Sequence, residues 1–409
     1  MSLSCFITTF AKNSNMKALS SINDLQSPCY IFHEERFEDS VKELNEALSA
    51  CFKHGNVAVS VKTNSSCVYL SKAASMGCMA EVVSEYEYRL ALDCGFKPDM
   101  IVYNGPFKSE ESFVHALKHG STVNIETMRE LDWLKKIPVT NQSFNIGIRI
   151  NINIEDIDKD ESLICNADSR FGFFHKTGEI KKVINQISKI PHINIKGMSI
   201  HRTTKSRKPE TYHNMAVYLS KLVKEYDLDI DYIDFGGGYS GMLPDSPTWI
   251  EYVMAIREGF NKSGLKIDRI IMEPGSALAG SSFDFLTECI DVHVSSHEKR
   301  ICTINGSRND IDPFFRKENY FYEIITRADS NRFPHQIIGG FTCLEDDIIL
   351  RLVDEPTIEI GDKVLFKRTG AYTMTLTPSF IRPAVCSIYT HKNGTYVLST
   401  KPGTELHEK

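Results

Sequence analysis

The sequence predicts an α/β protein in which a (β/α)8 TIM barrel is followed by a smaller all-β domain. Between residues 57 and 282, eight short apolar runs are each followed by an amphipathic segment. Beyond residue 283 the chain changes to short strand-like runs separated by turn residues. The length of 409 residues exceeds one ordinary domain. We therefore expect a poorly structured N-terminus (1–27), a strand that joins the β domain (28–35), a barrel (36–282) and a C-terminal β domain (283–409).

The barrel prediction depends on the regular alternation of strand and helix, which is typical of a closed parallel barrel rather than an open sheet. The expected strands are Val57–Val61, Met79–Val83, Met100–Tyr103, Thr122–Ile125, Asn145–Ile150, Ile195–Ile200, Tyr232–Phe235 and Arg269–Met272. The expected helices include Glu34–Phe52 before the first of these strands and Glu85–Asp93, Glu110–His119, Thr127–Leu134, Glu179–Ser188, Glu210–Glu225 and Trp249–Phe260 between them. Active sites of such barrels lie at the C-terminal ends of the strands.

The second domain is predicted from β-prone runs and turn sequences, and we expect a β-barrel or β-sandwich. The expected strands are Thr287–Val294, Arg300–Ile304, Tyr320–Ile325, Ile348–Leu352, Lys363–Lys367 and Val385–Tyr389, with Tyr30–Phe32 as an added strand. Glu-Ile-Gly-Asp at 359–362 and Lys-Asn-Gly-Thr at 392–395 are typical turn sequences.

Composition excludes several classes of protein. A hydrophobic content of 42% and a charged content of 24% are those of a soluble globular protein. The net charge of −6 argues against nucleic acid as a partner. No apolar run reaches the roughly 20 residues of a membrane span. Eleven cysteines without C-x-x-C pairs suit reduced thiols, so we expect a cytoplasmic protein.

The first expected barrel strand ends by placing Lys62 beyond its C-terminal end. Thr63, Asn64 and Ser65 follow it and offer N-cap chemistry for a helix. A lysine in an apolar strand is costly to bury as an ammonium ion, so it either reaches solvent or has a chemical role. Solvation is the ordinary explanation for such a lysine alone.

Other strand ends also carry polar groups. Strand two carries Glu81, strand six ends in His201-Arg202-Thr203-Thr204, strand seven in Asp234-Phe235-Gly236-Gly237-Gly238-Tyr239, and strand eight in Glu273-Pro274-Gly275-Ser276. Each has a plain structural explanation: a core histidine, a tight turn, a loop carboxylate. Together they bring a lysine, an imidazole, a carboxylate and an anion-binding glycine turn to one barrel mouth. Pyridoxal phosphate requires this set of groups.

The chain resembles the fold type III, alanine-racemase-like pyridoxal-phosphate decarboxylases of diaminopimelate, ornithine and arginine over roughly residues 28–390. Val59 to Asn64 resembles the Schiff-base lysine motif, and Glu81 to Ser84 the strand-two motif. His201 to Thr204 resembles the His-x-Gly-Ser motif, which implies that His201 stacks on the cofactor ring and Thr204 touches the phosphate. Asp234 to Gly238 resembles the glycine turn. Glu273-Pro274-Gly275 resembles the segment whose glutamate meets the pyridine nitrogen.

Two further motifs of the resemblance fall in the β domain. Gly340-Phe341-Thr342-Cys343 with Asp347 resembles the motif that supplies a cysteine across a dimer interface, which implies a homodimer with a shared active site. Gly370-Ala371-Tyr372 resembles the motif whose tyrosine reaches the phosphate. The implied catalytic residues are Lys62, His201, Glu273 and Cys343. The implied cofactor-binding residues are Lys62, His201, Thr204, Gly236, Gly237, Gly238, Glu273, Gly275, Ser276 and Tyr372.

The resemblance implies decarboxylation of an amino acid. The substrate amine displaces Lys62 from its aldimine with the cofactor, carbon dioxide leaves, and Cys343 of the partner subunit returns a proton to the α-carbon. A carboxylate at Glu273 keeps the pyridine nitrogen protonated. Two alternatives stay open: an amino-acid racemase on the same fold, in which the family pattern pairs that nitrogen with an arginine, and a non-catalytic pyridoxal-phosphate-binding relative.

The substrate itself stays open, because the chain departs from the family pattern at three positions. Ser276 replaces a phosphate-clamping arginine, Asp312 stands where an arginine reading a distal carboxylate is expected, and Leu344 replaces a common acidic residue. The changes at Asp312 and Leu344 weaken both meso-diaminopimelate and simple ornithine as substrates, and Ser276 bears on the phosphate. A diaminopimelate-, ornithine- or lysine-like amino acid, or a carboxylated derivative, stays open as the substrate. Candidate substrate-binding residues are Arg308, which could read a distal carboxylate, and Glu345, Asp346 and Asp347, which could meet a distal ammonium. We predict no metal site, since His115 and His119 have helical spacing but no third ligand.

Overall fold

The computed structural model describes residues 18–401, apart from 140, 160, 162–168, 242, 244, 296, 318, 328–330, 378 and 383–385. Two compact units emerge. The barrel unit comprises Asp39–Lys62 and Leu70–Leu278. The β unit comprises Thr63–Tyr69 and the described parts of Met1–Glu38 and Ala279–Lys409. Most of the expected unstructured N-terminus, and Val385 of an expected strand, lie outside the described residues.

The barrel unit contains a closed ring of eight parallel strands among the described residues, which confirms the predicted (β/α)8 fold. The strands are β2 (His54–Ser60), β3 (Met79–Ser84), β4 (Ile101–Phe107), β5 (Thr122–Ile125), β6 (Phe144–Asn151), β8 (Ile193–Ile200), β9 (Tyr232–Asp234) and β10 (Arg269–Met272). They pair in chain order, and β10 pairs with β2 to close the ring. A two-residue strand, β7 (Phe173–Phe174), pairs with β6 beside the ring.

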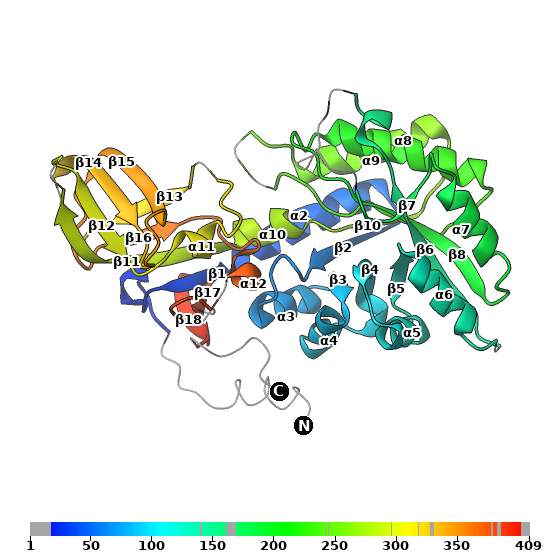
Figure 1. Ribbon diagram of the computed structural model, residues 1–409, viewed down its shortest axis with the longest axis horizontal. Coiled ribbons are helices and arrows are strands. Elements are labelled where there is room, and N and C mark those ends of the chain that lie inside the picture. The colour runs from blue at the N-terminus through cyan, green and yellow to red at the C-terminus, as the bar shows by residue number, and fades with distance from the viewer. Residues whose placement is uncertain are drawn as a thin grey trace. The chain divides into compact units, whose positions relative to one another are not determined.

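Helices follow the barrel strands, and α4 to α9 cover their outer side (Figure 1). The helices are α3 (Cys67–Ser75), α4 (Glu85–Asp93), α5 (Glu110–Lys118), α6 (Met128–Lys136), α7 (Glu179–Ile187), α8 (Pro209–Glu225), α9 (Trp249–Ser263) and α10 (Gly275–Ser282), with α2 (Glu34–Cys51) before β2. Local sequence begins several of them: Ser84 caps α4, Ser109 caps α5, and Thr127 with Glu130 forms a capping box on α6. Among the described residues, no helix combines the length and apolarity needed to cross a membrane.

The barrel interior is filled by side chains that point inward from neighbouring strands. Ala58, Met79, Val102, Tyr232 and Ile271 form one such cluster, and each is almost fully buried. Burying a large apolar side chain stabilises the fold by roughly 1.5–3 kcal/mol. Packing of this kind leaves the strand ends, rather than the middle of the barrel, for chemistry.

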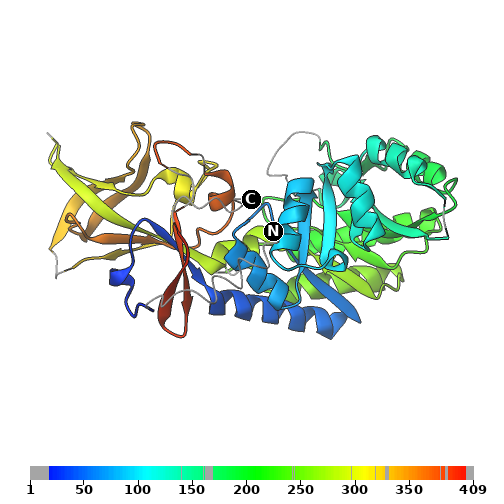
Figure 2. The same ribbon diagram turned by 90° about the horizontal axis from the view of Figure 1, so that it is seen from below.

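The β unit is built on one mixed sheet. Its strands are β1 (Cys29–His33), β11 (Phe283–Val294), β12 (Arg300–Ile304), β13 (Tyr322–Ile325), β14 (Arg332–Gly339), β15 (Ile348–Pro356), β16 (Lys363–Phe366), β17 (Ser387–Lys392) and β18 (Thr395–Thr400). β1 lies between β11, to which it is antiparallel, and β17, to which it is parallel. β17 and β18 form a hairpin, red in Figure 2. The apolar core of the β unit includes Cys29, Ile31, Leu286 and Leu365.

Several elements of this unit were not among the expected ones. They are β14, β18 and the short helices α11 (Arg308–Ile311) and α12 (Thr373–Leu376). β14 begins Arg-Phe-Pro-His, and a proline inside a strand argues against strand from sequence. The all-β character of the unit is confirmed.

Candidate active site

Lys62 lies two residues beyond the end of β2 and has a buried counter-ion. Its Nζ donates to Ser60 Oγ at 2.9 Å and forms an ion pair with Glu81 of β3. Ser60 also donates to Glu81 Oε2 at 2.5 Å. The Lys62 side chain is 37% exposed and that of Glu81 only 2%. The ammonium group is therefore held at the barrel mouth rather than freely solvated.

Glu81 remains ionised in this setting. Burial alone would raise the pKa of its carboxyl, but the Lys62 ammonium and the hydrogen bonds from Lys62 and Ser60 together hold that pKa below its usual range. β2 and β3 are adjacent parallel strands, with Ser60 paired to Glu81 in register, and this pairing brings the three side chains together.

His201 follows β8 and is held as a neutral imidazole. Burial lowers its pKa to about 3, and the cations Arg149, Lys62 and Arg202 act in the same direction while Glu81 opposes them. Its Nδ1 accepts a hydrogen bond from the Gly237 N–H at 2.8 Å. The ring is thus fixed in orientation and uncharged over the physiological pH range.

The glycine turn after β9 packs directly against this imidazole. Gly236 has φ +58, and a Cβ there would overlap His201 Nδ1 and lie 2.8 Å from His201 Cβ. A Cβ at Gly237 would lie 2.7 Å from the backbone oxygen of Glu273. The first two N–H groups of the turn are already used, because Gly236 donates to Asp234 Oδ1 at 2.9 Å and Gly237 to His201. Gly238 N–H has no partner among the described residues, so it is the turn amide available to an anion.

Glu273 follows β10 and is 5% exposed. Burial, together with the charges of Asp234 and Glu81, raises its pKa well above the usual range. The Glu273 and Asp234 carboxyls hydrogen-bond to each other, and burial raises the pKa of Asp234 to about 6. Without a positive partner, this acid pair retains a proton.

The two hydroxyl residues predicted to contact the phosphate, Thr204 and Ser276, differ in their hydrogen bonding. Thr204 is buried, and its Oγ1 accepts a hydrogen bond from the Arg207 N–H at 3.1 Å. Ser276 lies in the first turn of α10, which begins at Gly275, and its hydroxyl has no hydrogen-bond partner among the described residues. Helix N-termini favour anions, so Ser276 and the start of α10 suit a phosphate.

The remaining predicted residues belong to the β unit. Tyr372 has φ +64, donates its N–H to Thr63 O at 2.7 Å and packs against Phe314. Cys343 is exposed in a turn that Asp347 organises: the Asp347 carboxylate accepts from Thr342 Oγ1 at 2.7 Å and from the Arg308 N–H at 2.9 Å.

Among the substrate-binding candidates of the β unit, one is held in an ion pair within the unit and two have exposed carboxylates. Arg308 is engaged, because its guanidinium pairs with Asp312 at 3.4 Å and lies over the Phe315 ring. Asp312 is buried and also accepts N–H groups from Arg316 and Lys317. The carboxylates of Glu345 and Asp346 are exposed beside Cys343. Their predicted substrate-binding roles stay predictions.

Sequence reasoning missed the amides behind Glu273. Asn104, on β4, donates to Glu273 Oε1 at 2.7 Å, and Asn124, on β5, donates to Asn104 Oδ1 at 2.8 Å. Both are buried. The available signal was an amide inside an otherwise apolar strand, as in Thr-Val-Asn-Ile.

These residues fit pyridoxal phosphate. The turn at Gly236 and Gly237 packs too closely on His201 and the Glu273 backbone to admit a Cβ, Gly238 N–H and the start of α10 are open to a phosphate, and His201 offers a neutral ring. Lys62 has an amine that could hold the cofactor, and Glu273 has a carboxyl whose pKa is raised well above the usual range. The (β/α)8 barrel and the polar groups at its mouth together define a barrel enzyme of the pyridoxal-phosphate-dependent class.

Comparison with known proteins agrees with this class. The family profile described as "Pyridoxal-dependent decarboxylase, pyridoxal binding domain" matches residues 38–280. The diaminopimelate decarboxylase of Zymomonas mobilis is 24% identical over 395 residues, which cover 93% of this chain and 91% of that protein. The Helicobacter pylori diaminopimelate decarboxylase complexed with L-lysine has a TM-score of 0.77 at 22% identity, covering 91% of this chain and 94% of that chain. The Paramecium bursaria Chlorella virus arginine decarboxylase bound to agmatine has a TM-score of 0.74 at 21% identity, covering 90% and 98%.

The chain therefore belongs to the pyridoxal-dependent decarboxylase family. It is a pyridoxal-phosphate-dependent amino-acid decarboxylase, a carboxy-lyase. The predicted family, activity and cofactor are confirmed.

Proposed function

We propose that Lys62, His201 and Glu273 carry the chemistry of this decarboxylase at the barrel mouth. The supporting observation is their proximity: the glycine turn binds His201 through Gly237 N–H and the Glu273 N–H through Gly236 O, each at 2.8 Å, and Lys62 pairs with the neighbouring Glu81. Pyridoxal phosphate, when bound, supplies the electron sink that stabilises the carbanion left by loss of carbon dioxide. Lys62 would hold the cofactor, with Glu81 and Ser60 orienting its Nζ.

The surrounding residues have separate tasks. His201 is neutral, so it would stack on the ring without repelling a protonated nitrogen. Glu273 holds a proton in the buried acid pair with Asp234 and would face the ring nitrogen. Gly238 N–H, Gly275, Ser276 and Thr204 would surround the phosphate, with Tyr372 contributing its hydroxyl. An acid at Glu273 favours decarboxylation over racemisation, for which the family pattern has an arginine there.

A homodimer that shares its active site completes this proposal. Cys343 of the partner subunit would return a proton to the α-carbon, and its thiol is exposed here. Large apolar side chains are also exposed in the β unit, and such patches mark protein interfaces. They include Phe314, Phe315, Leu344, Leu376 and Ile381, which are 43–59% exposed.

The proposed substrate is an amino acid with a distal positive charge and no distal carboxylate. Arg308 is neutralised by Asp312, so it is not poised to read a carboxylate, while Glu345 and Asp346 stand open beside Cys343. Agmatine, the ligand named for the similar arginine decarboxylase structure, carries a distal guanidinium and no carboxylate. Lysine, ornithine, arginine and carboxylated polyamines fit this description.

Carbon dioxide release from a substrate panel tests the proposal. We expect turnover of at least one distal-cation amino acid, and loss of both turnover and the visible cofactor absorbance in Lys62→Ala. Activity on meso-diaminopimelate alone would contradict the substrate class. Change of optical rotation without carbon dioxide release would identify a racemase.

The remaining proposals concern organisation and location. The division at residues 28–35, 36–282 and 283–409 is supported by β1 joining the sheet of the β unit. A cytoplasmic location is supported by cysteines that are all free among the described residues. The net charge of −6 supports the absence of a nucleic-acid partner.

A further inference from the structure

A chain of buried polar side chains crosses the interior of the barrel and ends at Glu273. Tyr232 Oη, on β9, donates to Asn124 Oδ1 at 2.8 Å. Asn124 Nδ2 donates to Asn104 Oδ1 at 2.8 Å, and Asn104 Nδ2 donates to Glu273 Oε1 at 2.7 Å. Asn124 Nδ2 also donates to Asp234 Oδ2 at 3.1 Å. All four members of the chain are at most 5% exposed.

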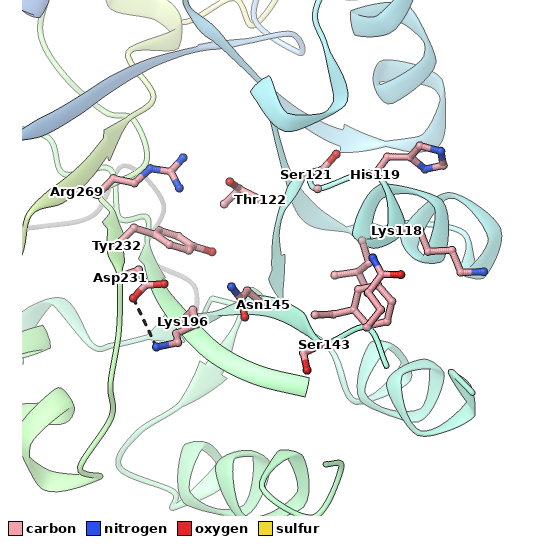
Figure 3. A pocket seen from close by; sticks show the side chains of 14 residues that line it. Lys118, His119, Ser121, Thr122, Ser143, Asn145, Lys196, Asp231, Tyr232 and Arg269 are labelled. Atoms are coloured by element: carbon pink, nitrogen blue, oxygen red, sulfur yellow. Dashed lines mark ion pairs between the residues drawn. The ribbon is translucent and has the colours of Figure 1, made fainter. Parts of the chain in front are cut away.

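The chain starts at the end of the barrel opposite the mouth. Tyr232 lines a cavity of about 500 Å3 together with Thr122, Phe144 and Arg269, each the first residue of a barrel strand. Figure 3 shows Tyr232 between Arg269 and the Asp231–Lys196 ion pair. The Arg269 guanidinium lies 5.5 Å from the centre of the Tyr232 ring. The hydrogen-bonded chain therefore spans the barrel from its N-terminal face to its mouth.

Two glycines make room for it. A Cβ at Gly147, on β6, would overlap both Asn124 Oδ1 and Tyr232 Oη, and a Cβ at Gly197, on β8, would overlap the Tyr232 ring. Glycine inside a strand weakens it and often marks a close approach. Glycine at positions 147 and 197 therefore leaves the space in which Tyr232 and Asn124 meet.

The hydrogen bonds of the chain all run in one direction, from the phenol through two amides to the carboxyl. Amides aligned in this way polarise one another and strengthen the last donor. Apart from Asp234, Asn104 is the only side chain within the described residues that hydrogen-bonds to Glu273. The other ionisable groups that face Glu273 are Asp234, Glu81 and Tyr239, which disfavour its negative charge, and Lys62, which favours it.

We propose that Asn104, Asn124 and Tyr232 are positioning residues that orient the Glu273 carboxyl and stabilise its ionised form. The proposal rests on the proposed function of Glu273 as partner of the ring nitrogen. A carboxyl held by a donor on Oε1 presents its other oxygen in a fixed direction. The same donor eases release of the proton from the Glu273–Asp234 pair when a basic nitrogen arrives.

Infrared difference spectroscopy of the cofactor-free protein tests the proposal without depending on turnover. The protonated carboxyl band of Glu273 is assigned by its absence in Glu273→Gln and is then titrated with pH. Asn104→Leu is expected to raise the titration midpoint by about one to two pH units, since it removes a hydrogen bond to a charged group. Tyr232→Phe is expected to raise it less, because it acts through two amides. Tyr103→Phe is the matched control, since it removes a buried phenol bonded to Ser112 at 2.8 Å outside the chain, and should leave the midpoint unchanged.

The holoenzyme adds a second readout. Asn104→Leu is expected to lower kcat with little change in KM and to shift the pH profile of kcat upward. Asn104→Ser, too short to reach both neighbours, replaces it if the leucine variant does not fold. An unchanged midpoint in these variants overturns the positioning role, even if Glu273→Gln abolishes activity. A shifted midpoint with full activity in Glu273→Gln leaves the positioning role intact and overturns the proposed function of Glu273.

Discussion

Replacing Gly236 by alanine tests the close packing between the glycine turn and His201. The new Cβ would overlap the imidazole Nδ1, and the residue would keep φ +58. A left-handed conformation costs an alanine about 1–2 kcal/mol, and overpacking costs a further 1–3 kcal/mol or so. We therefore expect Gly236→Ala to lower the free energy of unfolding by roughly 2–5 kcal/mol.

The control is Gly77→Ala. Gly77 has φ +76, and a Cβ there meets nothing within 4 Å, so this variant carries the conformational cost alone. The difference between the two variants, about 1–3 kcal/mol, isolates the contact with His201. The double variant with His201→Ala should recover most of that difference, because the overlapping ring is then absent.

Urea unfolding of the cofactor-free protein, followed by tryptophan fluorescence, measures these changes. The two tryptophans, Trp133 and Trp249, both lie in the barrel unit and are buried, so the signal reports that unit. Gly236→Ala should also weaken cofactor binding, whereas Gly77→Ala should not. Equal destabilisation by the two variants would refute the reasoning.

Three further predictions concern a buried carboxyl, a buried ion pair and an exposed thiol. Burial and the charge of Glu81 raise the pKa of Glu87 to about 7, so its contribution to stability is present below pH 4.5 and lost as the pH rises through 7. The free energy of unfolding in urea of Glu87→Gln should match that of wild type at pH 4 and exceed it at pH 8 by about 3 kcal/mol; parallel pH curves would contradict this. Lys108 and Glu130 form a fully buried ion pair at 2.6 Å, so Lys108→Met should lower the free energy of unfolding in urea by about 3–5 kcal/mol. As the control, Lys136→Met breaks the exposed pair with Glu110 and should lower it by less than about 1 kcal/mol. Cys343→Ser should lower kcat roughly 100-fold or more in a carbon dioxide assay while leaving unfolding unchanged, since Cys343 is exposed; full activity would exclude the thiol as proton donor.

The barrel could be predicted because buried parallel strands are continuous apolar runs, each followed by an amphipathic helix. The eight expected strands coincide with β2, β3, β4, β5, β6, β8, β9 and β10 to within a few residues. Helix α10 follows the eighth strand as the fold requires, but its range was not assigned, because Gly-Ser-Ala-Leu-Ala-Gly-Ser-Ser shows no helical alternation of apolar and polar faces. β18 follows a turn that was identified, but its half-buried Thr-Tyr-Val-Leu-Ser-Thr was not assigned.

The site was predictable only where residues have distinctive chemistry or a motif. Lys62, Glu81, His201 and the glycine turn stand at strand ends, and the ring of strands brings them together. Asn104 and Asn124 could not be identified, because an amide contributes to a site only through partners that are distant in sequence. Glu273 and Asn104 are 169 residues apart, and no local pattern links them. Arg308 was predicted as a possible carboxylate reader, and its pairing with Asp312 became visible only in the structure.

The position of β1 between β11 and β17 makes the order of synthesis matter for folding. Roughly 250 residues separate His33 from Phe283, so a ribosome adding about 5–20 residues per second completes β1 some 10–50 s before its first partner exists. During that interval the apolar strand Cys-Tyr-Ile-Phe-His has no sheet to join, while the strands of the barrel can already pair with one another. The nascent chain can therefore complete its barrel first, and it carries the unpaired apolar strand β1, which is open to aggregation, until its last 120 or so residues emerge.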